Sequence, residues 1–158
     1  MKKEIEKWYE QQDPWLYETT EDDKLRKAKI LSHCDGHYKR ALDIGAGEGF
    51  ITRDLPSKVI HAYEISDNAS SRLPDNVSRV TELKGKYDLI IATGVMYKHY
   101  DWWSFIDIIK NHASGKVIIS SIKDWEVSEI KELGEPIYTE EFPYREYIQT
   151  LKIYDFTS

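Results

Sequence analysis

A cluster of glycines follows a short apolar run and has the spacing of a turn that could hold a ligand. Residues 41–44 are mostly apolar, Gly45, Ala46, Gly47 and Gly49 form the turn, and residues 50–55 have an apolar spacing that predicts a helix. Glycine accepts positive φ, and without a Cβ it lets a ligand lie against the main chain. We therefore expect a strand, a glycine turn and a helix whose first amides point at the ligand.

The spacing and charge of this turn indicate what kind of ligand it suits. Dinucleotide-binding folds use G-x-G-x-x-G, whereas here the third glycine comes one residue early and Phe50 takes the last position. Asp43 lies two residues before the first glycine, where it would repel a pyrophosphate and attract a ligand that carries an ammonium and a sulfonium. The pattern D-x-G-x-G-x-G resembles motif I of the Rossmann-like, S-adenosylmethionine-dependent methyltransferases. The alternative is a tight turn in some other α/β protein.

The resemblance implies S-adenosyl-L-methionine as the cofactor and a set of residues that bind it. Asp43 and the glycine turn come first, and Glu64 and Ile65 end the next β-branched run, at about the distance where an acid meets a ribose in such folds. Glu82 is the nearest candidate for the acid that meets the adenine, and Gly94 follows a later strand. The alternatives are an exposed acid at the end of a strand for Glu64 and a solvated loop acid for Glu82.

Aromatic and titratable residues near these segments are candidates for a lid and for catalysis. Trp15 and Tyr17 are expected to cover the cofactor, with core packing as the alternative. Because a sulfonium methyl is already activated, few catalytic groups are needed beyond those that align the nucleophile and exclude water. Tyr97 could orient the acceptor and His99 could take its proton. Alternatively, Tyr97 packs under the lid and His99 is an exposed loop residue.

The expected acceptor is a small molecule, such as an amine, an amino sugar or a hydroxylated metabolite, methylated on nitrogen or oxygen. DNA amino-methyltransferases carry a D/N-P-P-Y/F/W motif after the fourth strand, but residues 92–97 contain no proline. The net charge of −6 also argues against a nucleic-acid partner. A second hypothesis is a non-catalytic module that binds the cofactor or its product. An open pocket beside residues 95–101 would favour the enzyme, and aromatic side chains filling that space would favour binding alone.

The order of motifs also resembles the nodulation-protein-S-like branch of small methyltransferases. That branch has a D-P-W segment before the first helix, then L-D/E-I-G, a strand ending in an acid, an F/Y-D-L-I strand and an aromatic turn. The matching segments are Asp13-Pro14-Trp15, Leu42-Asp43-Ile44-Gly45, Glu64-Ile65-Ser66, Tyr87-Asp88-Leu89-Ile90 and Val95-Met96-Tyr97.

Strands and helices alternate along the chain, which predicts an α/β fold. Strands are expected at 41–44, 58–63, 77–80, 87–92 and 116–122, with two more in the tail, and helices at 1–12, 20–35, 100–112 and 127–133. In the second helix, Leu25, Ala28, Ile30 and Leu31 should form the buried stripe. The prediction is a Rossmann-like, doubly wound, mostly parallel seven-stranded sheet with the last strand antiparallel and helices on both faces. Residues 1–36 would form a helical lid and residues 37–158 the core.

Composition places these elements in one small domain. With 158 residues, 41% hydrophobic and 32% charged, the chain has the balance of a globular domain with a single core. No apolar run reaches the length of a membrane span and the charged start is unlike a signal peptide, so we expect a cytoplasmic monomer or homodimer with no membrane partner. One cysteine and the lack of a Cys or His cluster at ligand spacing predict no metal site.

Overall fold

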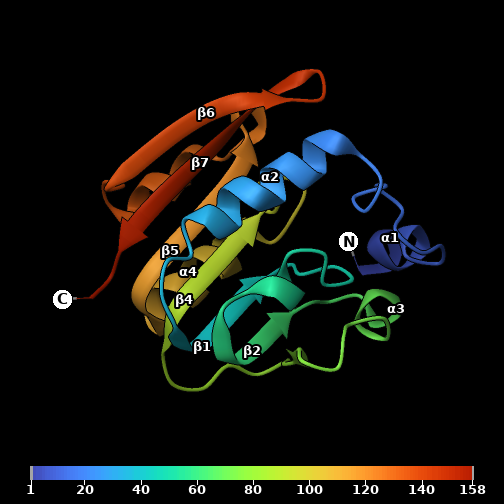
Figure 1. Ribbon diagram of the computed structural model, residues 1–158, viewed down its shortest axis with the longest axis horizontal. Helices are drawn as coiled ribbons and strands as arrows, with labels where there is room; N and C mark the ends of the chain where they lie inside the picture. Colours follow the sequence, from blue (N-terminus) through green and yellow to red (C-terminus); the bar gives the residue numbers. More distant parts are fainter. Residues whose placement is uncertain (1, 158) are drawn as a thin grey trace.

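The computed structural model describes residues 2–157, which form one sheet in the order β3-β2-β1-β4-β5-β7-β6 (Figure 1). Its strands are β1 (Tyr38–Ile44), β2 (Ser57–Tyr63), β3 (Ser78–Arg79), β4 (Tyr87–Thr93), β5 (Ala113–Ile122), β6 (Tyr138–Tyr144) and β7 (Tyr147–Asp155). Every pairing from β3 to β5 is parallel, whereas β7 runs antiparallel to both β5 and β6. The predicted seven-stranded, mostly parallel sheet with an antiparallel last strand is confirmed.

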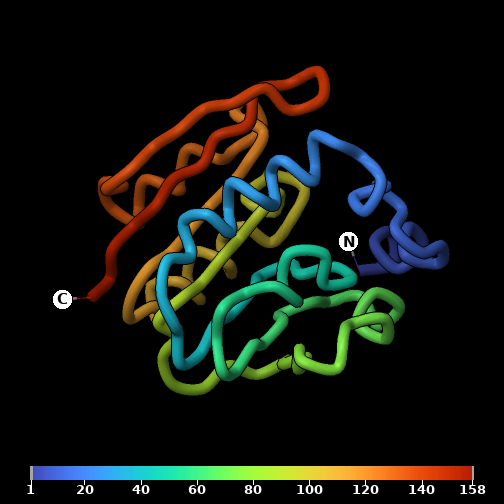
Figure 2. Tube along the Cα trace, viewed as in Figure 1, coloured from blue at the N-terminus to red at the C-terminus, as the bar shows by residue number. Residues whose placement is uncertain are grey.

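Helices cover both faces of the sheet, as predicted. The α-helices are α1 (Lys2–Trp8), α2 (Glu21–Ser32), α3 (Asp67–Ser70) and α4 (Trp102–His112), and the 3-10 helices are η1 (Thr52–Asp54), η2 (Lys123–Trp125) and η3 (Ser128–Leu133). Helix α2 crosses one face and α4 lies on the other (Figure 1). The N-terminal segment runs from α1, beside α3, to α2 (Figure 2).

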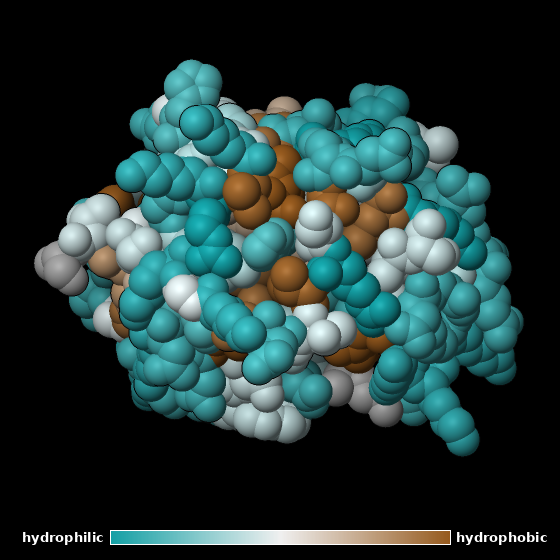
Figure 3. All heavy atoms as spheres, turned by 90° about the horizontal axis from the view of Figure 1, so that it is seen from below, coloured by the Kyte–Doolittle hydropathy of each residue, from teal (hydrophilic) through white to brown (hydrophobic). Residues whose placement is uncertain are grey.

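The core is centred on β4, which is buried on both faces. Its residues Ile90 and Ile91 are fully buried and point to opposite sides. Ile90 packs in a cluster with Ile109 of α4, and Ile91 packs in a second cluster with Ile30 of α2. The continuous apolar run that predicted this strand therefore reflects burial against two helical layers. On the face seen from below, hydrophobic atoms remain visible between hydrophilic side chains (Figure 3).

The helix predicted for residues 50–55 is wrong, because only the short η1 forms there. Gly49 still has a positive φ of 89°, so a helix could not begin before Phe50. Leu55 is extended, with ψ of 132°, as expected for a residue that precedes a proline, here Pro56. The few residues between Gly49 and Pro56 are too short a stretch for a stable α-helix. The prediction that the first amides of a helix point at the ligand is therefore wrong as well. The backbone of the glycine turn takes that place.

The helix predicted for residues 127–133 forms over residues 128–133 as the 3-10 helix η3. The buried stripe predicted for the second helix needs correction. On α2, Leu25 is 48% exposed and Ala28 is exposed, while the buried residues are Asp23, Arg26 and Ile30. The buried face of α2 is partly polar because its first two turns meet other polar side chains and a cavity. Hydrophobicity alone therefore predicts the wrong buried face for α2.

None of the helices within residues 2–157 is long and apolar enough to cross a membrane. The division into residues 1–36 and 37–158 stays a prediction. Helix α2 packs on the sheet as one of its covering layers, whereas α1 lies against α3.

Candidate functional site

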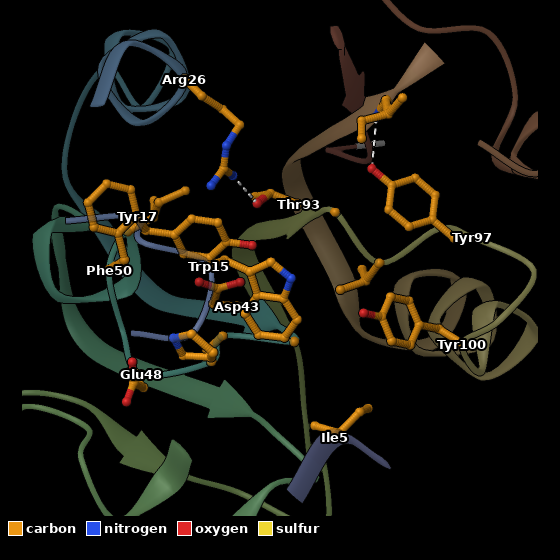
Figure 4. A pocket seen from close by; sticks show the side chains of 18 of the residues that line it. Ile5, Trp15, Tyr17, Arg26, Asp43, Glu48, Phe50, Thr93, Tyr97 and Tyr100 are labelled. Carbon is orange, nitrogen blue, oxygen red and sulfur yellow. Dashed lines mark hydrogen bonds between the residues drawn. The ribbon is translucent and has the colours of Figure 1, made fainter. Parts of the chain in front are cut away.

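A cavity of about 430 Å³ lies at the carboxyl ends of the parallel strands. Its lining comes from the ends of β1, β2, β4 and β5, from the segment between α1 and α2, and from the β6–β7 hairpin. In α/β sheets with this topology, ligands bind at this edge. The volume lies within the range of about 300–1,000 Å³ that is usual for small-molecule sites. Arg26, Tyr17, Trp15 and Asp43 point into this space (Figure 4).

The glycine turn forms one wall of the cavity. Gly45 and Gly47 both line it and both have positive φ, 73° and 60°. A Cβ on Gly45 would lie 2.5 Å from Val95, and one on Gly47 would lie 2.6 Å from the hydroxyl of Tyr9. Both positions therefore require glycine for backbone conformation and for space. Gly49, which was predicted to bind the cofactor, does not line the cavity. A Cβ at this position would meet Pro74 at 2.9 Å.

Glu64 and Asp43 place two buried carboxylates beneath this turn. Glu64 accepts hydrogen bonds from the amide of Gly47 at 2.6 Å and from the amide of Ser66 at 2.9 Å. Asp43 accepts one from the hydroxyl of Thr52 at 2.7 Å. Their exposed fractions are only 7% and 4%. The carboxylates are therefore fixed in position while they remain largely hidden from water.

Burial dominates the electrostatics of these two acids. It raises the pKa of Asp43 to about 7, since the loss of solvent and the charge of Glu64 outweigh the Thr52 hydrogen bond and the more distant guanidinium of Arg26. Burial also raises the pKa of Glu64, against the opposing effect of its backbone hydrogen bonds. Both groups would gain from a positively charged ligand, which would favour their ionised forms.

Aromatic rings from the segment between α1 and α2 lie over the turn. Trp15 stacks on Tyr17 with 6.0 Å between ring centroids, and Tyr17 stacks on Phe50 at 5.6 Å. The Asp13 carboxylate accepts from the amide of Tyr17 at 2.8 Å, and its own amide donates to Glu48 in the glycine turn at 2.7 Å. Trp15 and Tyr17 thus line the cavity on a segment tied to the turn. Their role as a cofactor cover stays a prediction.

Tyr9, which lies in the helix predicted for residues 1–12 and was not a predicted site residue, also belongs to the cavity lining. Its side chain is 6% exposed, and burial together with the charge of Glu64 raises its pKa. Helix α1 is held in place by Glu6, whose carboxylate accepts from the Ser66 hydroxyl and from the amide of Asn68 at 3.1 Å. This contact joins residues 60 positions apart, so no local pattern could have found it.

The loop after β4 contributes Gly94, Tyr97 and His99 to the lining. The Tyr97 ring is 5% exposed, and its hydroxyl oxygen accepts from the amide of Ile122 at 2.8 Å. Burial raises the pKa of this hydroxyl. The His99 ring stacks on Tyr97 at 5.7 Å and lies 4.3 Å from the ring of Tyr100. Tyr97 is therefore packed and anchored and His99 is exposed, and the catalytic roles of both residues stay predictions.

The structure brings most of the predicted residues to this one cavity. Those that line it are Trp15, Tyr17, Asp43, Gly45, Ala46, Gly47, Glu64, Ile65, Gly94, Tyr97 and His99. Glu82 does not line it, because its side chain is exposed on the loop after β3. The expected adenine role of Glu82 therefore has no support from its position. Within residues 2–157, no group of three His, Cys, Asp or Glu side chains is placed to hold a metal ion.

A buried polar network on the far side of the cavity had no counterpart in the sequence analysis. Asp23 is fully buried and accepts from Arg26 at 3.2 Å, from Arg145 at 2.6 Å and from the Tyr144 hydroxyl at 2.5 Å. Arg26 also donates to the Thr93 hydroxyl at 2.7 Å, at the end of β4 (Figure 4). The one sequence signal for this network was the pair Asp23 and Arg26 at i and i+3 on a helix. Such a pair is also typical of a solvated helix face.

Comparison with known proteins identifies the fold. No protein-family model and no curated protein sequence matches the chain. Magnesium protoporphyrin IX methyltransferase from Synechocystis PCC 6803, with S-adenosylmethionine bound, superposes with a TM-score of 0.74 at 16% identity, over 98% of this chain and 96% of that one. Phosphoethanolamine N-methyltransferase 1 from Haemonchus contortus, with S-adenosylhomocysteine, gives 0.62 at 18% identity, over 77% of this chain and 31% of that one.

A third similar structure has a different kind of substrate in its description. This protein from Pyrococcus horikoshii, described as a candidate RNA methyltransferase, gives a TM-score of 0.62 at 12% identity, over 85% of this chain and 82% of that one. The chain thus has the Rossmann-like fold of the class I methyltransferases. Its resemblance to the nodulation-protein-S-like branch stays a prediction.

Proposed function

We propose that this chain, which has the class I methyltransferase fold, binds S-adenosyl-L-methionine over its glycine turn and transfers the methyl group to nitrogen or oxygen of a small-molecule acceptor. The observation that carries the proposal is the pair of buried carboxylates, Asp43 and Glu64, beneath two glycines that line the cavity. Buried carboxylates are costly unless a positive charge or hydrogen bonds compensate them. A ligand with an ammonium and a sulfonium supplies that compensation.

The residues of the chain would hold this cofactor in complementary ways. Asp43 would attract its positive charge, and Glu64 has lone pairs left to accept from ribose hydroxyls, because the amides of Gly47 and Ser66 bond to different oxygens of its carboxylate. Trp15 and Tyr17 would exclude water from above the turn. When bound, the cofactor supplies an electrophilic methyl group. The remaining work of the protein is to orient the acceptor and keep the site dry.

The loop after β4 favours an enzyme over a non-catalytic binding module. His99, Tyr100 and Asp101 line a cavity that remains open beside them, as expected of a catalytic protein. The acidic net charge of −6 favours a small acceptor over a nucleic acid. A binding module that acts through a partner remains the alternative, and only turnover separates the two.

Calorimetric titration of the purified chain with S-adenosylmethionine, S-adenosylhomocysteine and NAD tests the proposal. We expect the first two to bind in the micromolar range, at about −8 kcal/mol, and NAD to give no heat of binding. A folded chain that binds neither sulfur compound would contradict the proposal. Once binding is established, release of S-adenosylhomocysteine in the presence of candidate amines and hydroxylated compounds would distinguish the enzyme from the binding module.

A further inference from the structure

The part of the cavity away from the glycine turn is enclosed by the β6–β7 hairpin. Ile122, at the end of β5, pairs with Gln149 of β7, and Tyr144 pairs with Tyr147 across the hairpin. This register places the hairpin turn, which contains Arg145, at the carboxyl edge of the parallel strands. Residues 144, 145, 147 and 149 all line the cavity. We call this part the hairpin half, defined by Arg26, Trp125, Arg145, Tyr147 and Gln149.

The hairpin half contains two guanidiniums. Both Arg26 and Arg145 pair with the carboxylate of Asp23, and a second carboxylate, that of Asp22, accepts from the backbone amide of Arg145 at 2.5 Å. Arg26 is 4% exposed, and its guanidinium lies 5.0 Å from the ring centroid of Tyr17. Its bonds to Asp23 and Thr93 involve three of its five N–H groups. Arg145 uses only Nη2 for its bonds to Asp23 and to the carbonyl of Trp15. Both guanidiniums therefore retain donors for a further acceptor.

Other acidic side chains of the lining have partners of their own. Asp13 accepts from the amides of Tyr17 and Glu18. Glu18 is paired with Arg53 at 2.7 Å, and Glu48 is paired with Arg72 at 2.7 Å. Asp43 and Glu64 lie at the glycine turn, where the proposed cofactor supplies their compensation. Glu146 and its neighbour Arg145 are both exposed, so water screens the two charges alike, and Asp101 lies on the loop after β4.

Gln149 offers a second, independent sign of a ligand in this half. Its side chain is 2% exposed and lines the cavity. Its amide nitrogen donates to the Ser120 hydroxyl at 2.7 Å, but its amide oxygen has no hydrogen-bond partner among residues 2–157. A buried polar atom without a partner costs about 1–3 kcal/mol. A ligand in the hairpin half could supply the missing donor.

Aromatic rings form the remaining wall. The Trp125 ring lies 5.0 Å from that of Tyr147 and 5.7 Å from that of Tyr97. Trp125 is nevertheless 45% exposed, although it lines the cavity. A large ring that is half-exposed at a cavity wall provides a surface on which a planar ligand can stack.

We propose that the hairpin half binds a methyl acceptor with a planar, unsaturated body and a carboxylate group. The carboxylate would accept from Arg26 and Arg145, the planar body would lie against Trp125 and Tyr147, and an O–H or N–H of the acceptor would donate to Gln149. Because the carboxylates of Asp23 and Asp22 already lie beside these guanidiniums, a ligand with one negative charge is favoured over a phosphate monoester, which brings about two. The ligand's role as the methyl acceptor rests on the proposed function, whereas binding of a planar carboxylate does not.

The test compares four probes on the full chain: benzoate, benzamide, cyclohexanecarboxylate and phenyl phosphate. Binding is measured by ligand-observed NMR, with and without S-adenosylhomocysteine. Benzamide removes the charge, cyclohexanecarboxylate removes the planarity, and phenyl phosphate doubles the charge. We expect benzoate to bind most tightly, with benzamide weaker by roughly tenfold, which is the factor that 1.4 kcal/mol represents. Equal binding of benzoate and benzamide would overturn the proposal, and tighter binding of phenyl phosphate would overturn the choice of a carboxylate.

Variants identify the groups involved. Arg145→Gln should abolish the preference for benzoate over benzamide, and it should fold because Arg145 is partly exposed and lies in a turn. Trp125→Ala should abolish the preference for benzoate over cyclohexanecarboxylate. Arg40→Gln is the matched control, because Arg40 bonds to the carbonyl of Lys86 at 2.6 Å and does not line the cavity. An unchanged benzoate preference in Arg145→Gln would overturn the proposal.

The two proposals fail in different ways. If the wild-type chain does not bind S-adenosylhomocysteine, the proposed function fails, and the probe comparison on the ligand-free chain still decides the carboxylate site. If S-adenosylhomocysteine binds equally to the wild type and Arg145→Gln while neither prefers benzoate, the proposed function stands and the carboxylate site is refuted.

Discussion

The glycine turn and the hairpin half solve the problem of buried charge in opposite ways. At the turn, the carboxylates of Asp43 and Glu64 are buried with hydrogen bonds but form no ion pair within residues 2–157, and burial raises the pKa of both. In the hairpin half, the carboxylate of Asp23 has two guanidinium partners. The first region stores an unfavourable electrostatic energy that a cationic ligand would relieve, and the second has guanidinium N–H groups that can still donate to an anion.

The largest effect should follow from closing the glycine turn. Gly47→Val would put a branched side chain at a φ of 60° and into the space beside the Tyr9 hydroxyl. We expect calorimetry to detect no binding of S-adenosylmethionine. Gly134→Val is the control, because Gly134 also has a positive φ, 92°, but a Cβ at this position would have no other atom within 4 Å. Normal binding by a folded Gly47→Val would refute the assignment of the turn.

Removing the shared carboxylate should have the next largest effect, on stability. Asp23→Ala would leave the buried Arg26 without its ion pair, and we expect the free energy of unfolding to fall by about 3 kcal/mol. Chemical denaturation measures this change. Glu21→Ala, on an exposed surface pair with Lys24, should change stability by less than about 0.5 kcal/mol. Equal stability of the two variants would show that the network contributes nothing.

Asp43→Asn should weaken cofactor binding while it stabilises the free chain at neutral pH. Asparagine keeps an oxygen for the Thr52 hydroxyl but has no charge to attract the ligand. We expect S-adenosylmethionine to bind roughly tenfold to a hundredfold more weakly, or about 1.4–2.7 kcal/mol. Asp107→Asn, at an exposed position on α4, is the matched control. Unchanged affinity in Asp43→Asn would remove Asp43 from the site.

The same carboxyl predicts a pH dependence. Its pKa of about 7 lies above the ordinary value of 3.8, so between about pH 4 and pH 7 the folded chain holds more protons than the unfolded chain. The stabilising effect of this group is therefore lost as pH rises through that window. A cation binds the ionised form, so affinity for S-adenosylmethionine should fall by up to about tenfold per unit below pH 7.

Thermal melts and titrations between pH 4 and pH 8 would measure both effects. Relative to the wild type, Asp43→Asn should gain melting temperature at pH 8 but not at pH 4, and its affinity should vary less with pH. A wild-type affinity that stays constant across this range would contradict the assigned role of Asp43.

The two regions also differ in how far the sequence predicts them. The turn is local: Asp43 and its glycines lie within a few residues, and their order carries the prediction. The strands could be predicted as well, because residues 87–92 are almost continuously apolar. In contrast, Asp23 meets Tyr144 and Arg145 across sequence separations of 121 and 122, so only the sheet topology brings them together.

Prediction failed where tertiary contacts override local pattern. Leu25 fits an apolar stripe, yet the cavity selects Arg26 for the inner face of α2 because Thr93 and Asp23 can accept its hydrogen bonds. Residues 50–55 have helical spacing, but Pro56 and the positive φ of Gly49 leave too little chain for a helix. Glu82 was chosen for its position in the sequence alone, and the loop after β3 directs it to solvent.

The tryptophan indole groups allow the most direct test that the two regions bind different molecules. Trp15 lies over the glycine turn, Trp125 lies in the hairpin half, and Trp103 is exposed on α4. In ¹H–¹⁵N spectra, S-adenosylhomocysteine should shift the Trp15 indole and the amides of residues 45–49, and leave those of Trp125 and Trp103 nearly unchanged. Shifts at Trp125 with an unperturbed glycine turn would contradict the account.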